Sequence, residues 1–272
     1  MEVIKVIQDE LNNLLEIKTE DGYTVEAVHY RGNTLCVSSQ VGCSIRCTFC
    51  ASGMNGFIRN LSFQEIVDQY RLVVESGYEV KNITFAGIGE PLLNWQNVKT
   101  SFEYFKSLGL KVSFYTTGFP ILYFRQLLDI NHNGVTLSIH SVYDEKRKSI
   151  IPNSQKVEEL LEILEEHIKN LSSRKKKLYS LGYLLIKDIN DSEKEIEELI
   201  RISKRLSLSV SLLKYNEVEG IPYKTTPDKE YEAIFLKLRE CDIKTTLSNR
   251  YRTRKIGGCG TLMINRLNYT TL

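Results

Sequence analysis

Short runs of β-forming residues alternate with amphipathic helical stretches along most of this 272-residue chain. Such alternation is typical of βα units, whose strands pair in a parallel sheet. Six such units predict an α/β fold with a partial (β/α)6 TIM-like barrel. The expected helices lie at 62–76, 97–108, 157–171, 192–206 and 228–241. The expected strands lie at 34–38, 82–86, 112–115, 135–139, 178–186 and 208–213.

A β-hairpin is expected before the first of these strands. Residues 16–28 are rich in β-forming side chains on both sides of Asp21 and Gly22, a pair that favours a tight turn. We therefore expect a short N-terminal extension with a hairpin over residues 1–33. The core would then cover residues 34–272 and include a C-terminal loop.

The composition is that of an ordinary globular protein, with 42% hydrophobic and 26% charged residues. No apolar stretch approaches the roughly twenty residues that a membrane-spanning helix needs. The N-terminal segment is acidic and lacks the apolar core of a secretory signal. Three of the six cysteines fall in one loop, which favours a reducing cytosol over a disulfide framework. We expect a cytoplasmic protein that does not bind membranes.

Positive charge is concentrated in two segments, residues 27–64 and the residues that follow 242. Residues 27–64 contain no acidic residue but include three arginines, Arg31, Arg46 and Arg59. If the two segments meet in space, they form the electrostatic footprint of a protein that binds a polyanion such as RNA. The alternatives are a solvated basic tail and, for the basic run at 174–177, a solvated loop. The segment after residue 242 also lacks acidic residues and accumulates Lys244, Arg250, Arg252, Arg254, Lys255 and Arg266.

Cys43, Cys47 and Cys50 are spaced so that three thiolates can converge on one face of a short loop. Three thiolate ligands leave one iron of a [4Fe–4S] cluster without a protein ligand, whereas an electron-transfer cluster usually has four. An open iron implies that another molecule binds there. The alternative is a zinc site, which requires a fourth Cys or His at similar spacing. The nearest histidines, His29 and His132, lie far from this loop in the sequence.

Polar residues follow nearly every expected strand at the same end. In βα folds, ligands bind beyond the C-terminal ends of the strands. We therefore expect a single site built from the cysteine loop and from 87–91, 116–118, 138–140, 187–190 and 214–216.

Several longer motifs support a specific resemblance, which extends from the hairpin to residue 262. They are Thr-Leu-Cys-Val-Ser-Ser-Gln-Val-Gly-Cys at 34–43, Gly-Phe-Ile-Arg-Asn-Leu at 56–61, Gly-Glu-Pro-Leu-Leu-Asn at 89–94, Leu-Ser-Ile-His at 137–140 and Gly-Cys-Gly-Thr-Leu at 258–262. The cysteine spacing is the signature of the radical S-adenosylmethionine (SAM) superfamily. With all these motifs, the chain resembles the radical-SAM dual-cysteine RNA methyltransferases, which methylate adenosine at C2 in rRNA and tRNA. It is similar also to their C8-methylating relative, the chloramphenicol–florfenicol resistance methyltransferase.

The resemblance implies two cofactors. A [4Fe–4S] cluster with one open iron would be held by Cys43, Cys47 and Cys50, and SAM would bind that iron. Gly89 and Glu90 would hold the amino group of SAM. The other residues expected at SAM are Tyr115, Ser138, Ile139, His140 and Asn216.

The resemblance also implies two catalytic cysteines. Cys259 would take a methyl group from one SAM by displacement, because C2 of adenine is too electron-poor to attack SAM itself. A radical derived from a second SAM would activate that S-methyl group, whose carbon then adds to the base. Cys36 would resolve the protein–RNA intermediate by forming a disulfide with Cys259. Glu26 would lie near the substrate base, although such a glutamate alone is more often a solvated strand residue.

The partners implied are RNA and a flavodoxin- or ferredoxin-type reductant, and we expect a monomer. The chain departs from the family pattern in three places. Only a short segment precedes the hairpin, where the family carries an N-terminal accessory domain that binds RNA. The loop before Cys259 is shorter than in the family, and Tyr115 stands where relatives have a serine that contacts SAM.

Two other functions remain open from the sequence. The first is a related radical SAM methylase that acts on a small molecule or a peptide, suggested by the absent accessory domain. The second is a redox or sensor protein that uses the cluster alone. The Gly-Glu-Pro and Gly-Cys-Gly motifs favour the methylases over the sensor.

Overall fold

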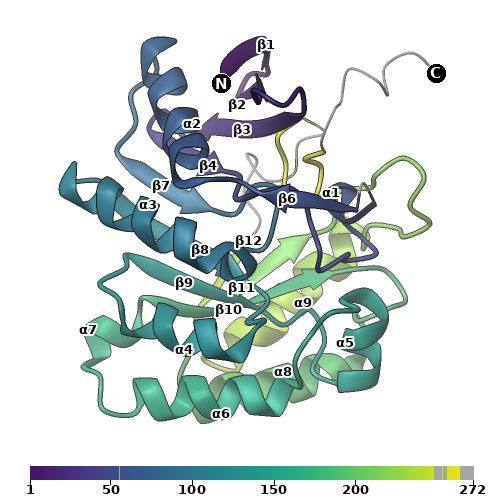
Figure 1. Cartoon of the computed structure of the whole chain (residues 1–272). Coiled ribbons are helices and arrows are strands. Elements are labelled where there is room, and N and C mark those ends of the chain that lie inside the picture. Colours follow the sequence, from purple (N-terminus) through teal and green to yellow (C-terminus); the bar gives the residue numbers. More distant parts are fainter. Residues whose placement is uncertain (55, 248–252, 254–255, 264–272) are drawn as a thin grey trace.

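The computed structural model describes residues 1–54, 56–247, 253 and 256–263. Its main feature is a sheet of ten strands in the order β1-β2-β3-β4-β7-β8-β9-β10-β11-β12, partly surrounded by helices (Figure 1). From β4 to β12 every neighbouring pair is parallel. The α/β fold predicted from the alternating pattern is therefore confirmed.

All six predicted core strands are present, and their observed ends differ from the predicted ones by at most one residue. A seventh parallel strand, β12 (Thr245–Leu247), escaped prediction because it is only three residues long. The six are β4 (Thr34–Val37), β7 (Asn82–Phe85), β8 (Lys111–Thr116), β9 (Gly134–Ser138), β10 (Tyr179–Leu185) and β11 (Ser209–Lys214).

The predicted hairpin is also present, formed by β2 (Asn12–Lys18) and β3 (Thr24–Tyr30). Gly22 has φ 92° in the turn, a conformation that glycine adopts without steric cost. A further strand, β1 (Glu2–Gln8), pairs with β2 and was not predicted. Because β3 pairs antiparallel with β4, these strands extend the parallel sheet without a break.

A small second sheet encloses the cysteine loop. It pairs β5 (Gln40–Gly42) with β6 (Phe57–Asn60), on either side of the loop and the short helix α1 (Ala51–Met54). The backbone N–H of Cys43 donates to the carbonyl of Gly56, 2.7 Å away, which closes the loop.

The five predicted helices are confirmed. Ser62 and Glu65, whose spacing predicts a capping box, form one at the start of the first. These helices are α2 (Phe63–Glu75), α3 (Trp95–Ser107), α6 (Val157–Ile168), α8 (Glu193–Leu206) and α9 (Asp228–Glu240). Helices that were not predicted are η1 (Pro91–Asn94), α4 (Ile121–Asp129), α5 (Asp144–Ile150) and α7 (Ser173–Lys176).

Two apolar clusters make up the core. The larger one packs the sheet against the helices, with Phe85 stacked on Phe114 at 5.0 Å between ring centroids. The smaller one lies at the C-terminal ends of the strands and includes the three loop cysteines at its edge. It therefore embeds the cysteine loop in apolar surroundings, which lower the local dielectric constant. None of the helices in the described residues is long and apolar enough to cross a membrane.

Candidate functional site

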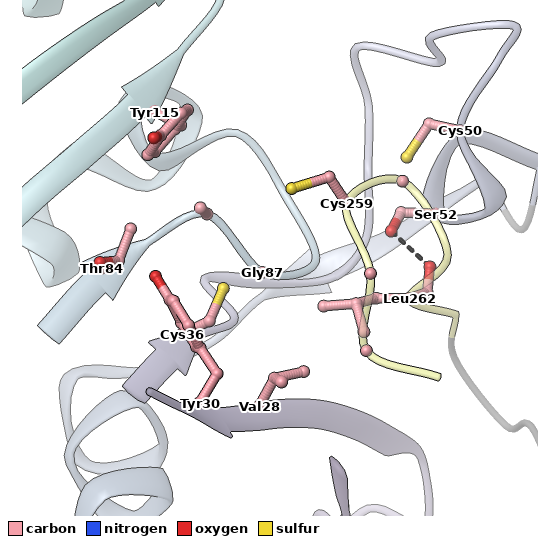
Figure 2. Close-up of a pocket in the computed structure, with 14 residues that line it drawn as sticks. Val28, Tyr30, Cys36, Cys50, Ser52, Thr84, Gly87, Tyr115, Cys259 and Leu262 are labelled. Carbon is pink, nitrogen blue, oxygen red and sulfur yellow. Dashed lines mark hydrogen bonds between the residues drawn. The ribbon is translucent and has the colours of Figure 1, made fainter. Parts of the chain in front are cut away.

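Two adjoining cavities open at the C-terminal ends of the parallel strands. We call them the cysteine-loop cavity and the Cys36 cavity, and Figure 2 shows the second of these. Both are lined by Cys50, Ser52, Ala86, Gly87, Tyr115, Cys259 and Gly260. The cysteine-loop cavity is also lined by Cys43, Ile45, Cys47, Phe49, Gly89, Glu90, Thr116, Thr117, Ser138, His140, Leu184, Leu213 and Tyr215. The Cys36 cavity is also lined by Val28, Tyr30, Cys36, Thr84, Gly257, Gly258 and Leu262.

The three loop cysteines line one cavity. Burial raises the pKa of Cys43 to about 12 and the pKa of Cys47 well above its ordinary value, and the neighbouring thiolates add to both shifts. Burial also raises the pKa of Cys50. A bound cation offsets this cost, since a coordinated thiol is deprotonated. The thiols are therefore poised for a positively charged metal group.

The arrangement of these thiols fits a cluster better than a single ion. Among the residues that the structure describes, no three or more Cys, His, Asp or Glu side chains are gathered closely enough to hold one metal ion. A tetrahedral zinc site needs four such ligands. A [4Fe–4S] cluster is larger and takes cysteine thiolates at separate irons, which suits three thiols spread around a cavity.

Contacts with one distant segment hold the backbone of the cysteine loop. The N–H of Thr48 donates to the carbonyl of Ile150, and Asn153 Nδ2 donates to the carbonyl of Ser44, 2.6 Å away. The loop thus packs on the segment around α5, although the two are about a hundred residues apart in sequence.

Glu90 presents a buried carboxylate to the same cavity. Its side chain accepts hydrogen bonds from the hydroxyl of Thr116, from the N–H and hydroxyl of Thr117, and from the N–H of Leu92. Burial raises the pKa of Glu90, and these hydrogen bonds act against the rise because they favour the charged form. A buried carboxylate in a cavity is suited to pair with a cationic group such as an ammonium.

His140 lies on the same wall, with φ 54°. Its Nδ1 accepts from the N–H of Leu184 at 3.1 Å, so the neutral ring carries its proton on Nε2. Burial lowers the pKa of His140 to about 3, and the nearby charge of Arg147 contributes. The imidazole is thus a neutral hydrogen-bond donor at physiological pH.

The other residues expected at SAM lie in different positions. Gly89 and Ser138 line the cysteine-loop cavity, and Tyr115 lies where the two cavities meet. Ile139 is fully buried, lines neither cavity, and contributes its backbone carbonyl to Arg147. The side chain of Asn216 donates to the carbonyl of Cys259 at 2.8 Å, so it contacts the C-terminal loop.

Cys36 and Cys259 come from opposite ends of the chain and meet at the Cys36 cavity. Figure 2 shows Cys36 on β4 and Cys259 on the C-terminal loop, with both sulfur atoms directed into the space between them. Cys259 is exposed and Cys36 is half-buried, and no disulfide joins them. Only Cys259 of this pair also lines the cysteine-loop cavity.

The loop at residues 256–263, here called the Cys259 loop, is held through its backbone. Gly257 has φ 70° and lies so close to Val28 that an added Cβ would be 2.9 Å from a methyl carbon. Glu26 lines neither cavity, and its carboxylate accepts from the N–H of Met263 at 3.0 Å. Three further groups donate hydrogen bonds to carbonyls of this loop. Asn12 Nδ2 donates to Ile256, the N–H of Ala51 donates to Gly260, and Ser52 Oγ donates to Leu262.

A buried arginine, Arg147, was missed by the sequence interpretation. Its guanidinium donates to the carbonyls of Ile139, Gln155, Thr117 and Ser138 at 2.7 to 3.1 Å. Burial lowers the pKa of Arg147 to about 10, so it keeps its charge at neutral pH. Its position within a charged stretch, Asp-Glu-Lys-Arg-Lys, is typical of an exposed helix and gave no sign of burial.

A second buried group, Glu195, also escaped notice and supports His140. Glu195 accepts from Ser141 Oγ and from the hydroxyl of Tyr183, which also donates to the carbonyl of Asn190. Asn190 Nδ2 in turn donates to the carbonyl of His140. This chain of polar contacts fixes the unusual backbone conformation of His140.

Only some of the basic residues predicted to form a positively charged surface lie in the described part of the chain. Arg59 forms ion pairs with Asp21 and Glu65, so its charge is neutralised by carboxylates from outside its own segment. Arg31 and Arg46 are exposed. Arg250, Arg252, Arg254, Lys255 and Arg266 lie outside the described residues.

Replacing Arg147 with methionine should destabilise the protein strongly. The substitution leaves four carbonyls without this donor, two of them in buried hydrogen bonds, and each buried group left unsatisfied costs about 1–3 kcal/mol. We expect the free energy of unfolding in urea to fall by roughly 3 kcal/mol or more. Arg201→Met, which removes only an exposed ion pair with Glu198, is the control and should cost less than about 1 kcal/mol. Equal effects of the two substitutions would contradict the role given to Arg147.

Acid should destabilise the fold through its buried histidines. The pKa values of His140 and His132 fall to about 3 and about 4 in the folded state, so the unfolded chain binds more protons below its own value of about 6.5. The stability present above pH 6.5 is therefore lost as the pH falls toward 4, by up to about 1.4 kcal/mol per pH unit for each histidine. Urea unfolding at several pH values should show a smaller slope for His140→Asn. A stability that does not change between pH 7 and pH 5 would contradict this prediction.

Comparison with known proteins identifies the family of this chain. Residues 37–201 match the Radical SAM superfamily. A protein of Aquifex aeolicus named "Probable dual-specificity RNA methyltransferase RlmN" is 34% identical over 274 residues, which cover 92% of this chain and 76% of that protein. The protein of the same name from Clostridioides difficile is 37% identical over 257 residues, covering 89% and 73% of the two chains.

Solved structures agree as well. The crystal structure of a radical SAM methyltransferase from Sphaerobacter thermophilus superimposes with a TM-score of 0.86 at 26% identity, and covers 96% of this chain and 80% of that one. Streptococcus suis SuiB bound to S-adenosylmethionine, at 14% identity and a TM-score of 0.60, shares the fold. The chain therefore belongs to the radical SAM superfamily and, within it, to the family of dual-specificity RNA methyltransferases.

Proposed function

We propose that this enzyme methylates a ring carbon, C2 or C8, of an adenosine in RNA, and that Cys259 carries the methyl group between the two cavities. The observation that supports this most directly is the position of Cys259. It lies on the wall that the two cavities share, so one side chain can face a SAM site on one side and a substrate site on the other. The names of the relatives support RNA as the substrate.

The cysteine-loop cavity is assigned to the cofactors. Cys43, Cys47 and Cys50 would hold a [4Fe–4S] cluster and leave one iron open for SAM. When bound and reduced by an external flavodoxin- or ferredoxin-type donor, the cluster with SAM supplies a carbon-centred radical. We assign the buried carboxylate of Glu90 to the amino group of SAM, since it is the anionic group of this wall.

Three further residues act around SAM in this proposal. His140, which is neutral and protonated on Nε2, is a donor to the ribose or carboxylate of SAM. Gly89 and Ser138 line the same wall. Ile139 and Asn216 contact no cavity directly, and we infer that they act through Arg147 and Cys259, respectively.

Two thiols are needed because the ring carbon of adenine is a poor nucleophile. The exposed thiol of Cys259 is accessible to the methyl donor, and a thiolate is the nucleophile in such a displacement. After the one-carbon unit has been joined to the base, the thiolate of Cys36 would attack the sulfur of Cys259. This step forms a disulfide and breaks the bond between that sulfur and the CH2 carbon. The electron pair left on the carbon takes up a proton, so a methyl group remains on the base.

The Cys36 cavity is assigned to the flipped base. Its walls combine the aromatic side chains of Tyr30 and Tyr115 with the apolar Val28 and Leu262. Such surfaces favour stacking and burial of a planar base that has left its helix. Glu26 contacts the end of the Cys259 loop, so we infer that it affects the base by fixing that loop.

Nucleoside mass spectrometry of RNA tests the proposal. RNA from cells that express the protein, in a host without its own C2 methylase, should contain a methyladenosine that is missing without the protein. Chromatographic retention then distinguishes C2 from C8 methylation. Cys259→Ala should abolish the product, because it removes the carrier of the methyl group, whereas Cys241→Ala, at the end of α9, should not.

Cys36→Ala gives a second readout. Without the resolving thiol the covalent protein–RNA intermediate should accumulate, and it should be absent from the Cys36→Ala/Cys259→Ala double variant. A protein that is loaded with cluster, cleaves SAM and yet produces no new nucleoside would refute the proposal.

A further inference from the structure

A groove lined by lysines lies at the end of the sheet opposite to the two cavities. It is bordered by α7, the end of α8 and the starts of β10, β11 and β12. In Figure 1, α7 lies at the left edge of the molecule, whereas α1 and α5, next to the cysteine loop, lie at the right. We call it the basal groove, and its lysines are Lys176, Lys177, Lys204 and Lys244.

The described residues do not form ion pairs with the lysines of this groove. None of the four lysines forms an ion pair with any residue that the structure describes, and Asp242 is the single carboxylate among the lining residues. Lys176 and Lys204 lie in the last turns of helices, where positive charge offsets the helix dipole. The same explanation covers Lys177, the C-cap residue of α7, but not Lys244, which lies between α9 and β12.

A polar group buried in the groove also lacks a partner. Ser203 lines the groove, is 1% exposed, and its hydroxyl makes no hydrogen bond. Buried hydroxyls are nearly always paired, since an unpaired one costs about 1–3 kcal/mol. The wall of the groove therefore contains a polar group that the described residues leave unpaired.

The backbone around the groove indicates which kind of anion can bind there. Sites for small anions usually present free N–H groups in a concave turn. Here the N–H groups along the rim are already used: Ser207 donates to the carbonyl of Lys204, Leu208 to that of Ser203, and Ile243 to that of Leu238. The groove therefore offers mobile lysine charges without a backbone cradle, which suits a chain of phosphates held by charge alone.

We propose that the basal groove binds the phosphodiester backbone of the RNA substrate, at a second contact remote from the modified base. The inference rests on the proposed function, because it takes RNA as the substrate. Strand β10 has seven residues and runs from the groove to the cavities, so the two sites are roughly 20 Å apart. About six steps of a nucleic-acid duplex, at roughly 3.4 Å each, cover that distance. The RNA must then be folded or paired rather than a short oligonucleotide.

The test is the salt dependence of RNA binding. The variant replaces Lys176, Lys177, Lys204 and Lys244 with glutamine, and its dissociation constant for the folded RNA is measured over a range of KCl concentrations. Each lost phosphate contact lowers the slope of log Kd against log [KCl] by about 0.7–0.9, so we expect a decrease of roughly 3. The rate of methylation at saturating RNA should not change, because these lysines lie away from both cavities.

A matched control removes the same amount of charge elsewhere. Lys5, Lys18, Lys156 and Lys229 are exposed and form no ion pair among the described residues, and their replacement by glutamine should leave the slope nearly unchanged. Equal slopes for the groove variant and the wild type, with methylation intact, would overturn the groove assignment alone. The groove assignment would also be overturned if inorganic phosphate raised the unfolding temperature of the wild type but not of the groove variant. That result is expected of a site for a small anion. A wild type that neither binds nor methylates RNA would instead overturn the proposed function.

Discussion

The loops that carry the site are held by one buried cation. Arg147 bridges the carbonyl oxygens of Thr117, Ser138 and Ile139, which lie at the C-terminal ends of the neighbouring strands β8 and β9. A guanidinium has five donors in a rigid plane, so it can satisfy several carbonyls that no apolar side chain could. Its carbonyl contacts fix the segments that contain Thr117 and His140. Because Thr117 holds the carboxylate of Glu90, the same cation indirectly fixes the anionic wall of the cofactor cavity.

The ionisable groups around the cysteine-loop cavity are arranged to bind charged groups of a ligand. Three half-buried thiols have raised pKa values, and a buried carboxylate and a buried guanidinium lie near them. Such an arrangement is costly in an empty site and favourable once cationic metal and ammonium groups enter. The same low dielectric constant keeps His140 neutral. Binding of the cofactors is therefore expected to stabilise the fold through mass action.

Part of this architecture could be predicted from the sequence. The strands were predicted correctly because runs such as that of β10 are long and apolar, and the spacing of Ser62 and Glu65 gave the start of α2. Short elements such as β12 and α7 have too few residues to show a period. The cysteine loop and Glu90 were found because their motifs are local. By contrast, Arg147 and Glu195 look like exposed helical charges until tertiary packing buries them.

Contacts distant in sequence also add to the interpretation of individual residues. Asn216 and Glu26, which the resemblance places at SAM and at the base, each make a hydrogen bond to the Cys259 loop. Arg59, counted among the free positive charges, pairs with Asp21 and Glu65. In each case the partner lies tens of residues or more away, or belongs to another element, and no local pattern encodes it. The position of Cys259 between the two cavities likewise depends on contacts between segments that are distant in sequence.

The central claim is that Cys259 carries the methyl group. Its most direct test is peptide mass spectrometry of the anaerobic, cluster-loaded protein after incubation with SAM that is isotopically labelled in its methyl group. We predict that the label appears on the Cys259 peptide and passes to adenosine when RNA and reductant are added. Labelled adenosine formed while the Cys259 peptide never carries the label, or formed equally by Cys259→Ala, would contradict the claim.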